Sequence, residues 1–303
     1  MASSTDTNAM PPLSHVSAPV LTVTCEGLSG RIPDQLAVEE PLEIRVGHSS
    51  PAGYITSSVS ITMRTPGEDR ELAAGFLLSE GVVTSLSDLV AVTVSPKPDA
   101  NMVRADLAPA LVFEPESQTR HFYTTSSCGI CGKASLAAIA ARGLKPIPRD
   151  ILRIAASVVH TLPETLRQAQ AGFEATGGLH ASALFDSSGA LLSLREDVGR
   201  HNALDKLVGG ELLAGRIPLH NRVVIVSGRS SFELVQKCIA AGVSVLASVG
   251  APSSLAVELA REWDLTLLGF VRNGRYNIYS GEWRILHEAQ NAGGLNSASA
   301  DQK

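Results

Sequence analysis

Long apolar runs are absent from this sequence, and so is the leader of a secreted protein. No run reaches the roughly 18 consecutive apolar residues that a membrane-spanning helix needs. The first residues, Met1 to Asp6, have neither the basic segment nor the leucine-rich segment of a secretory signal. We therefore expect a cytoplasmic protein that has no membrane partner.

Charge of one sign and aromatic residues are also scarce. The 25 Lys and Arg residues are slightly outnumbered by 30 Asp and Glu residues, which gives a net charge of −5, and aromatic residues make up only 4% of the chain. This balance argues against a nucleic-acid partner, because such proteins usually carry an excess of positive charge. The hydrophobic fraction of 44% over 303 residues is enough for one large core or two smaller ones.

Cysteine is rare as well, with four residues in the whole chain. Only Cys128 and Cys131 are close in sequence, so the disulfide framework of a small secreted protein is excluded. Cys25 follows a short apolar strand-like run. Cys238 shares a helical face with Val235 and Ile239, and we expect it to be a small buried hydrophobe.

The pair Cys128 and Cys131 stands in a glycine-flanked segment that leads into an apolar helical pattern near Lys133. Small neighbours leave both sulfur atoms accessible, while a helix start and a lysine favour the thiolate form, which is the nucleophile and the metal ligand. Three interpretations stay open for the pair: a sulfur-handling or redox site, half of a zinc site, or an ordinary loop. We take Cys128 and Cys131 as the candidate catalytic residues.

The first half of the chain has the pattern of short strands around one helix. Alternation of apolar and polar residues predicts strands over 41–46 and 59–63, and a strand pair over 89–95 and 102–107. The apolar spacing over 70–79 predicts a helix that ends before Gly81. The predicted organisation of the chain is a flexible arm over 1–18, an α+β region over 19–123, a mobile loop over 124–132, an α/β core over 133–290 and a disordered tail over 291–303.

The second half alternates strands with helices. Helices are predicted over 134–142 and 150–170, the latter interrupted by Pro163, and a hairpin joins 181–185 to 191–194. The remaining pattern predicts helices over 202–213, 232–241 and 254–263, and strands over 223–227, 243–249 and 266–271. Such alternation predicts an α/β fold with a mostly parallel sheet and helices on both faces.

Polar loops follow the strands of this predicted sheet, where ligands of open α/β sheets bind. The first is Ser227-Gly228-Arg229-Ser230, a second runs over 251–254, and the last is Phe270-Val271-Arg272-Asn273-Gly274-Arg275. Glycines, hydroxyl groups and arginines together predict an anionic, base-bearing ligand such as a nucleotide. Capped helix ends with solvated arginines are the alternative interpretation.

A fourth cluster, over 195–206, mixes eight polar or ionisable side chains at a strand-to-helix junction. We interpret it as part of a site, with a salt-bridged helix start as the alternative. Cys128, Cys131 and His180 have a spacing that permits a zinc site, but a fourth ligand is missing. The order of these residues also differs from that of zinc deaminases, where H-x-E precedes P-C-x-x-C.

Several long motifs, all in one order, resemble the FdhD/NarQ family of formate dehydrogenase accessory sulfurtransferases over about Glu39 to Tyr279. The motifs are Thr65-Pro66-Gly67, Glu71-Leu72-Ala73-Ala74-Gly75-Phe76-Leu77, Ser127-Cys128-Gly129-Ile130-Cys131-Gly132, Thr176-Gly177-Gly178-Leu179-His180-Ala181, Arg195-Glu196-Asp197-Val198-Gly199-Arg200-His201-Asn202-Ala203-Leu204-Asp205-Lys206, Ser227-Gly228-Arg229-Ser230-Ser231-Phe232-Glu233 and Ala251-Pro252-Ser253-Ser254-Leu255-Ala256.

The resemblance implies a sulfurtransferase that takes sulfur from a cysteine desulfurase as a persulfide on Cys128, with Cys131 as its partner. The acceptor would be the molybdenum or tungsten bis(molybdopterin guanine dinucleotide) cofactor, bound by the segment from Phe270 to Arg275, and the client would be formate dehydrogenase. The family resemblance further implies a homodimer and a cytidine deaminase-like α/β/α sandwich without the zinc site. Two alternatives stay open: a cofactor-binding chaperone without sulfur transfer, and a zinc deaminase-like hydrolase.

Overall fold

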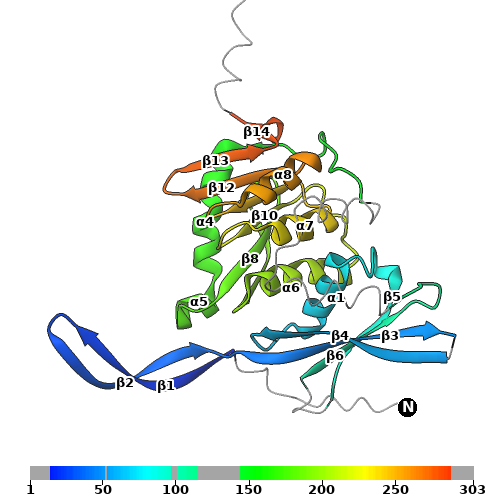
Figure 1. Ribbon diagram of the computed structural model, residues 1–303. Coiled ribbons are helices and arrows are strands. Elements are labelled where there is room, and N and C mark those ends of the chain that lie inside the picture. Colours follow the sequence, from blue (N-terminus) through cyan, green and yellow to red (C-terminus); the bar gives the residue numbers. More distant parts are fainter. Residues whose placement is uncertain (1–13, 52, 97–100, 115–143, 288–303) are drawn as a thin grey trace, which may run out of the picture.

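The computed structural model describes residues 14–51, 53–96, 101–114 and 144–287. Within these ranges the chain forms a layered body and a projecting two-stranded arm (Figure 1). None of the described helices is long and apolar enough to cross a membrane. The predicted helix over 134–142, the loop over 124–132 and the tail over 291–303 lie outside the described residues and stay predictions.

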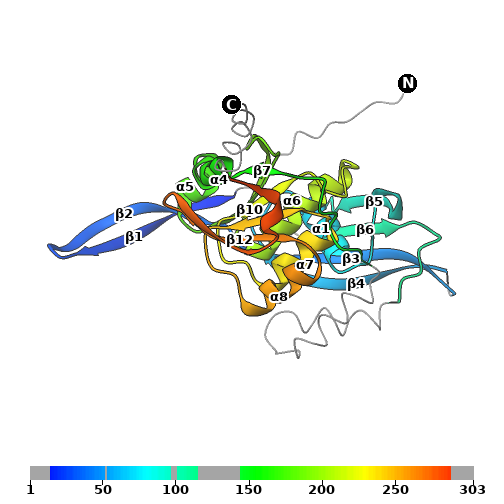
Figure 2. The same cartoon turned by 90° about the horizontal axis from the view of Figure 1, so that it is seen from above.

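The arm is a hairpin of β1 (His15–Thr24) and β2 (Gly27–Ala37) that extends away from the body (Figures 1 and 2). Large apolar side chains on it are exposed, among them Val23 and Leu28. The sequence predicted a flexible N-terminal segment over residues 1–18. The boundary at residue 18 is wrong, because β1 already begins at His15. The hairpin was missed because its residues pair through the backbone without covering an apolar face.

The N-terminal layer is a four-stranded sheet. It contains β3 (Glu40–Ser50), β4 (Gly53–Arg64), β5 (Leu89–Val94) and β6 (Met102–Leu107) in the order β4-β3-β6-β5. The predicted strands are confirmed, although β3 and β4 are longer than predicted. Backbone pairing continues through Ser49, Ser50 and Ser57, where the apolar alternation has already ended.

Two helices cross at a very short distance between the N-terminal layer and the rest of the body. They are α1 (Asp69–Ser79) and α6 (Arg200–Leu213). A Cβ on Gly75 would lie 1.9 Å from the carbonyl oxygen of Asp205, and a Cβ on Gly209 would lie 1.9 Å from that of Glu71. The two glycines therefore allow the helices to pack backbone against backbone.

The second sheet has six strands in the order β13-β12-β11-β10-β8-β9. Its members are β8 (His180–Phe185), β9 (Leu191–Asp197), β10 (Val223–Val226), β11 (Val245–Ser248), β12 (Thr266–Arg272) and β13 (Arg275–Ser280). Only β10, β11 and β12 are mutually parallel. The prediction of a mostly parallel sheet is wrong, because β13 pairs antiparallel with β12, β8 pairs antiparallel with β10, and β9 pairs antiparallel with β8.

Helices cover both faces of this sheet, as predicted. On one face α6 lies with α7 (Phe232–Ala240) and α8 (Ser254–Glu262), and on the other lies α4 (Ala156–Ala169) (Figure 1). Alternate residues of β10 point to opposite sides: Val224 belongs to the first apolar cluster and Ile225 to the second. The chain is therefore a mixed α/β protein with an apolar core on each side of its sheet.

The predicted helix over 150–170 begins later and is not interrupted. Pro163 lies inside α4, which continues through it to Ala169. The proline removes one backbone hydrogen bond, but the helix is held against the sheet by the buried residues Val159, Leu162 and Leu166. The short elements that complete the fold are β7 (Ile154–Ala155), α5 (Ala171–Thr176), β14 (Ile285–Leu286) and the 3₁₀ turns Leu86–Asp88 and Glu282–Arg284.

Candidate functional site

Three of the predicted polar segments meet at one edge of the six-stranded sheet, where the parallel strands β10, β11 and β12 have their carboxyl ends. The backbone N–H of Gly250, after β11, donates to the carbonyl of Gly228 over 2.9 Å. The N–H of Phe270 donates in turn to the carbonyl of Gly250 over 3.0 Å. The first and last segments are thus joined through the middle one, as the carboxyl-edge interpretation requires.

Some residues of the first loop, Ser227 to Ser230, hold the fold together, and others are exposed to solvent. Ser227 links β10 to β8, since its Oγ accepts a hydrogen bond from the N–H of Ala181 over 2.9 Å. Ser230 is almost fully buried, and its Oγ has no hydrogen-bond partner in the part of the chain that the structure describes. Arg229 is exposed beside them. The loop therefore presents an exposed guanidinium to a ligand, while the hydroxyl of Ser230 is enclosed by the protein.

Glycine is required at the contact between the first two loops. A Cβ on Gly250 would lie 3.0 Å from the carbonyl oxygen of Gly228 and 3.1 Å from the Cα of Arg229. A side chain at position 250 would therefore push the loops apart. The backbone surface that results is open to a polar ligand at close range.

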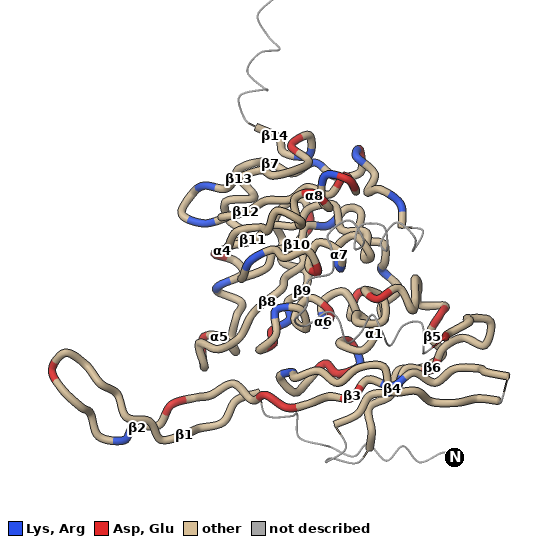
Figure 3. The backbone as a smooth tube through the Cα atoms, viewed as in Figure 1, with Lys and Arg blue, Asp and Glu red and all other residues tan. Residues whose placement is uncertain are grey.

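The last segment is not a strand-to-helix loop like the other two. Asn273 and Gly274, with φ of 53° and 69°, form the two-residue turn of the hairpin between β12 and β13, and Arg272 pairs with Arg275 across it. Figure 3 shows the turn as a basic tip of the molecule. Because Val271 is fully buried in the apolar cluster under α4, its side chain is unavailable to a ligand, contrary to the sequence-based assignment.

Phe270 connects the basic tip to the carboxyl edge. Its backbone adopts a φ of 55° at an irregularity of β12, and its ring is partly exposed. The guanidinium of Arg272 lies over this ring at 5.7 Å from its centroid. An aromatic ring and a cation are thus held next to the backbone hydrogen bond from Phe270 to Gly250.

Two histidines lie near the first loop of the carboxyl edge. His180 begins β8 beside Gly228, and its burial, followed by the charges of Arg200 and His201, lowers the pKa of its imidazole. His201 lies 3.1 Å from a carboxylate oxygen of Glu233 and 3.3 Å from the hydroxyl of Ser231. The hydrogen bond from His201 is the main cause that lowers the pKa of Glu233.

The pairing of His201 with Glu233 was not predicted from the sequence. The two residues stand at the starts of different helices, α6 and α7, and only the tertiary fold brings them together. The sequence signal for this contact was a histidine in the first turn of one predicted helix and a Ser-x-Glu pattern at the start of another. Such polar residues are also common at helix starts, so the signal was not specific.

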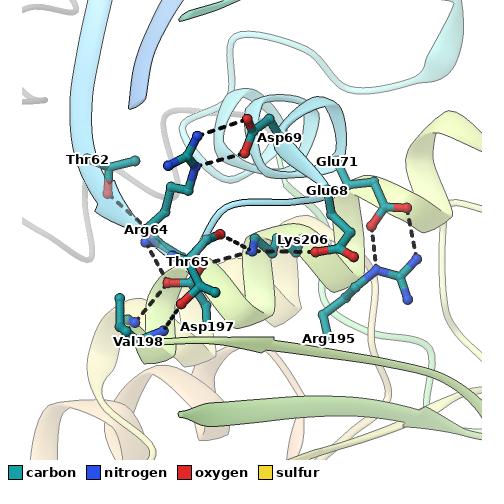
Figure 4. A network of polar contacts seen from close by, with 12 residues as sticks. Thr62, Arg64, Thr65, Glu68, Asp69, Glu71, Arg195, Asp197, Val198 and Lys206 are labelled. Carbon is teal, nitrogen blue, oxygen red and sulfur yellow. Dashed lines mark hydrogen bonds and ion pairs between the residues drawn. The ribbon is translucent and has the colours of Figure 1, made fainter. Parts of the chain in front are cut away.

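Most of the polar cluster over 195–206 is structural (Figure 4). The fully buried Asp197 accepts the N–H of Thr65 over 3.1 Å and lies 2.9 Å from the ammonium of Lys206, which also donates to the carbonyl of Thr65. Arg195 forms a two-pronged ion pair with Glu71. These contacts fasten the second sheet to the N-terminal layer, so the interpretation as a site fails for Arg195, Asp197 and Lys206.

Cys128 and Cys131 lie outside the described residues, so their roles stay predictions. Cys238 is fully buried, as predicted, and burial raises the pKa of its thiol. Cys25 is exposed at the turn of the arm. Within the described ranges, no group of three or more His, Cys, Asp or Glu residues is placed to hold a metal ion.

Comparison with known families gives a match over most of the chain. The model of the FdhD/NarQ family matches residues 37–286, which include both sheets and the carboxyl edge. The chain belongs to the FdhD/NarQ family. The resemblance that the motifs predicted is therefore confirmed.

Curated relatives of this FdhD/NarQ chain come from several organisms. The sulfur carrier protein FdhD of Streptomyces avermitilis is 48% identical over 276 residues, which cover 89% of this chain and 95% of the relative. The sulfur carrier protein FdhD of Sulfurisphaera tokodaii is 42% identical over 253 residues, which cover 84% of this chain and 92% of the relative. The match thus extends over nearly the full length of both relatives.

The fold of the FdhD/NarQ chain is also that of a solved structure. A crystal structure described as a candidate formate dehydrogenase accessory protein from Desulfotalea psychrophila matches with a TM-score of 0.70. The match covers 90% of this chain and 100% of the other, at 22% sequence identity. At that identity the likeness shows the shared fold.

Proposed function

We propose that this FdhD/NarQ protein is a sulfur carrier that serves a formate dehydrogenase. The observation that carries the proposal is near full-length identity of 42–48% to proteins from distant organisms that are all named sulfur carrier protein FdhD. The Ser127-Cys128-Gly129-Ile130-Cys131-Gly132 motif supplies the sulfur chemistry that such a role needs. Cys128 is the carrier in this proposal, and Cys131 is its partner.

Loading of Cys128 is a thiol–disulfide type exchange. The Cys128 thiolate attacks the terminal sulfur of a persulfide on a cysteine desulfurase and forms a new S–S bond. The S–S bond of the donor breaks, and the donor cysteine leaves as a thiolate. One sulfur atom moves and no external oxidant is needed. A cysteine desulfurase is therefore the partner that the proposal requires.

Mass spectrometry after incubation with a cysteine desulfurase and free cysteine tests the carrier. The wild-type protein is expected to gain the mass of one sulfur atom, and Cys128→Ala is expected to gain none. Cys25→Ala is the matched control, because Cys25 is also an exposed thiol and its loss should leave loading unchanged. A Cys128→Ala protein that still gains sulfur at any other cysteine contradicts the assignment.

The acceptor in this proposal is the molybdenum or tungsten bis(molybdopterin guanine dinucleotide) cofactor, which is cargo to be modified. Its pyrophosphate groups could be bound at the carboxyl edge by the exposed residues Arg229, Arg272 and Arg275. Each of these guanidinium groups can donate two parallel hydrogen bonds to a phosphate. The close backbones of Gly228 and Gly250 fit a polar ligand as well, with Ser230 in the same loop behind them. The side chain of Val271 is left out of this set because it is buried.

Titration with guanosine diphosphate tests this assignment, since that molecule reproduces the end of a cofactor arm. Replacing Arg272 and Arg275 together by Gln is expected to weaken its binding at least tenfold, because two charge-assisted contacts are lost. Arg31→Gln, an exposed change on the arm, is the control. Equal affinity in all three proteins would remove the hairpin tip from the binding site.

The remaining parts of the proposal concern the whole assembly. We infer a cytoplasmic homodimer with a cytidine deaminase-like α/β/α sandwich. The layering of α4 on one face of the sheet and α6, α7 and α8 on the other supports the sandwich. The exposed apolar residues of the arm, such as Val23 and Leu28, support an assembly larger than one chain.

A further inference from the structure

A cavity of about 430 Å³ lies between the N-terminal sheet and the first turns of α6 and α7. It is separate from the hairpin tip and from the loops after β10 and β11, since no residue of those segments lines it. Its volume falls in the range of roughly 300–1,000 Å³ that small-molecule sites occupy. The cavity is therefore large enough to hold a small organic molecule.

The cavity has one apolar side and one ionic side. Ile44 from β3, together with Leu72 and Phe76 from α1, forms the apolar side. Arg200 and His201 from α6, with Glu233 from α7, contribute to the ionic side. A ligand that fills the space would need an apolar or aromatic part and a charged part, each facing the matching side.

Most charges on the ionic side are already neutralised within the protein. The ammonium of Lys237 lies 2.8 Å from both carboxylate oxygens of Asp205, which also accepts the hydroxyl of Ser79 over 2.8 Å. The carboxylate of Glu233 is bonded to His201 and Ser231. These residues are therefore satisfied without a ligand.

Arg200 is different. Its Nε atom is buried and has no hydrogen-bond partner, and its side chain takes part in no ion pair among the residues that the structure describes. A guanidinium N–H that is buried without an acceptor is unfavourable. An oxyanion in the cavity would supply an acceptor to the guanidinium of Arg200.

The helix ends add to the positive potential at the same place. The first turn of α6, behind Gly199, and that of α7, behind Ser231, have no side-chain cap. Both helices are long enough for their aligned N–H groups to attract an anion at that end. Arg200 and His201 stand in the first turn of α6, so the cation and the helix end act on one region.

We propose that this cavity binds a small organic oxyanion, with an aromatic or apolar body on the apolar side of the cavity and a phosphate or carboxylate group on Arg200. The site is additional to the sulfur carrier role and to the carboxyl edge. The proposed site can be tested without the sulfur carrier role, because binding of an organic anion is measured on the purified protein without a desulfurase or a client enzyme.

Calorimetric titration with phenyl phosphate and with benzoate tests the proposal and separates the two kinds of oxyanion. The wild-type protein is expected to bind at least one of them, and Arg200→Gln is expected to bind it at least tenfold more weakly, as the loss of a charge-assisted contact implies. Arg200→Lys keeps the charge and is expected to recover part of the affinity. Arg70→Gln is the matched control, because Arg70 stands in the first turn of α1 outside the cavity.

The contribution of the apolar side is measured with inorganic phosphate, which has no body to fill it. Weaker binding of inorganic phosphate than of phenyl phosphate, or its absence, supports the proposal. The proposal is overturned if neither organic anion binds the wild-type protein, if Arg200→Gln binds as tightly as the wild type, or if inorganic phosphate binds as tightly as phenyl phosphate. Thermal denaturation of each variant confirms that the fold is retained.

Discussion

His180 lies at the amino end of β8, where burial is the main cause that lowers the pKa of its imidazole, followed by the charge of Arg200. The folded protein therefore keeps His180 neutral at pH values where the unfolded chain protonates it. Since the unfolded state then binds more protons, the contribution of His180 to stability is present above about pH 6.5 and is lost as the pH falls below that value.

An NMR titration of the histidine ring protons checks this expectation. The midpoint of His180 is expected below 6.5, and Arg200→Gln is expected to raise it because a nearby positive charge is removed. A midpoint at or above 6.5 in the wild-type protein would show that the imidazole is more hydrated than the structure indicates.

Gly75 determines how closely α1 approaches α6. A Cβ at this position would lie 1.9 Å from the backbone carbonyl of Asp205, and a backbone atom cannot move aside without a shift of the helix. Gly75→Ala is therefore expected to reduce the free energy of unfolding by about 1–3 kcal/mol, as overpacking does elsewhere. Urea denaturation followed by circular dichroism measures the change.

Gly178→Ala is the matched control for that experiment. Its Cβ would meet no atom closer than 3.6 Å, and its φ lies outside the left-handed region. We expect a change within about 0.5 kcal/mol, which is usual for a surface substitution. If Gly75→Ala were equally mild, the close crossing of the two helices would be refuted.

At the scale of elements, the ion pair between Lys206 on α6 and Asp197 at the end of β9 holds the N-terminal layer to the second sheet. Both side chains are fully buried, 2.9 Å apart, and both contact Thr65. Lys206→Met leaves the Asp197 carboxylate buried without its cation. We expect a loss of about 3–5 kcal/mol in the free energy of unfolding, measured by urea denaturation.

An exposed ion pair provides the comparison. Arg149 pairs with Asp264 over 2.7 Å, but the arginine side chain is 60% exposed. Arg149→Gln is therefore expected to cost less than about 1 kcal/mol, because water and salt screen such a pair. A Lys206→Met variant as mild as this control would mean that Asp197 gains access to water and that the layers are less tightly joined than the structure shows.

The arm of β1 and β2 is expected to be the least protected pair of strands. A two-stranded hairpin is marginally stable by itself in water, and its apolar residues Leu21, Val23 and Leu28 are exposed. Hydrogen exchange followed by mass spectrometry is expected to show faster exchange in peptides from the arm than in those from β10. Equal protection would mean that the arm is covered in solution, as it would be by a second chain.

The sequence predicted elements well where one face of the element is apolar and buried. The helix α1 and the strands β5 and β6 match their predicted ranges closely. In β6 the buried residues alternate as the sequence pattern indicates, whereas α1 is buried on more than one face because it lies between the two layers. The continuous helix through Pro163 could not be predicted, since burial of Leu162 and Leu166 against the sheet outweighs the local cost of proline. Tertiary packing, which no local pattern contains, decides such cases.

For the candidate site, the sequence predicted which loops meet but not which side chains are available. Parallel strands bring Ser230 and Phe270 to one edge, and this follows from topology alone. Whether the side chain of Val271 or that of Phe270 faces the carboxyl edge depends on the register shift in β12 between Gly269 and Arg272. No residue pattern in the sequence predicts that shift. The contact between His201 and Glu233 depends in the same way on how α6 packs beside α7.

At the scale of the whole molecule, the N-terminal layer and the second sheet share one apolar cluster. Leu42 and Leu72 from the first layer belong to the same cluster as Leu204 and Val224 from the second half of the chain. The predicted division between residues 19–123 and 133–290 therefore does not separate two independent cores. The body that presents the carboxyl edge is a single packed unit in the described residues.

In the proposed function, sulfur carried on Cys128 activates a formate dehydrogenase. The most direct measurement is the activity of the client enzyme after maturation with wild-type protein, with Cys128→Ser, and with Cys25→Ser as the control. We expect full activity with the wild type and the control, and no activity above background with Cys128→Ser. Full activity with Cys128→Ser would rule out sulfur transfer through Cys128 and would favour a chaperone that binds the cofactor without transferring sulfur.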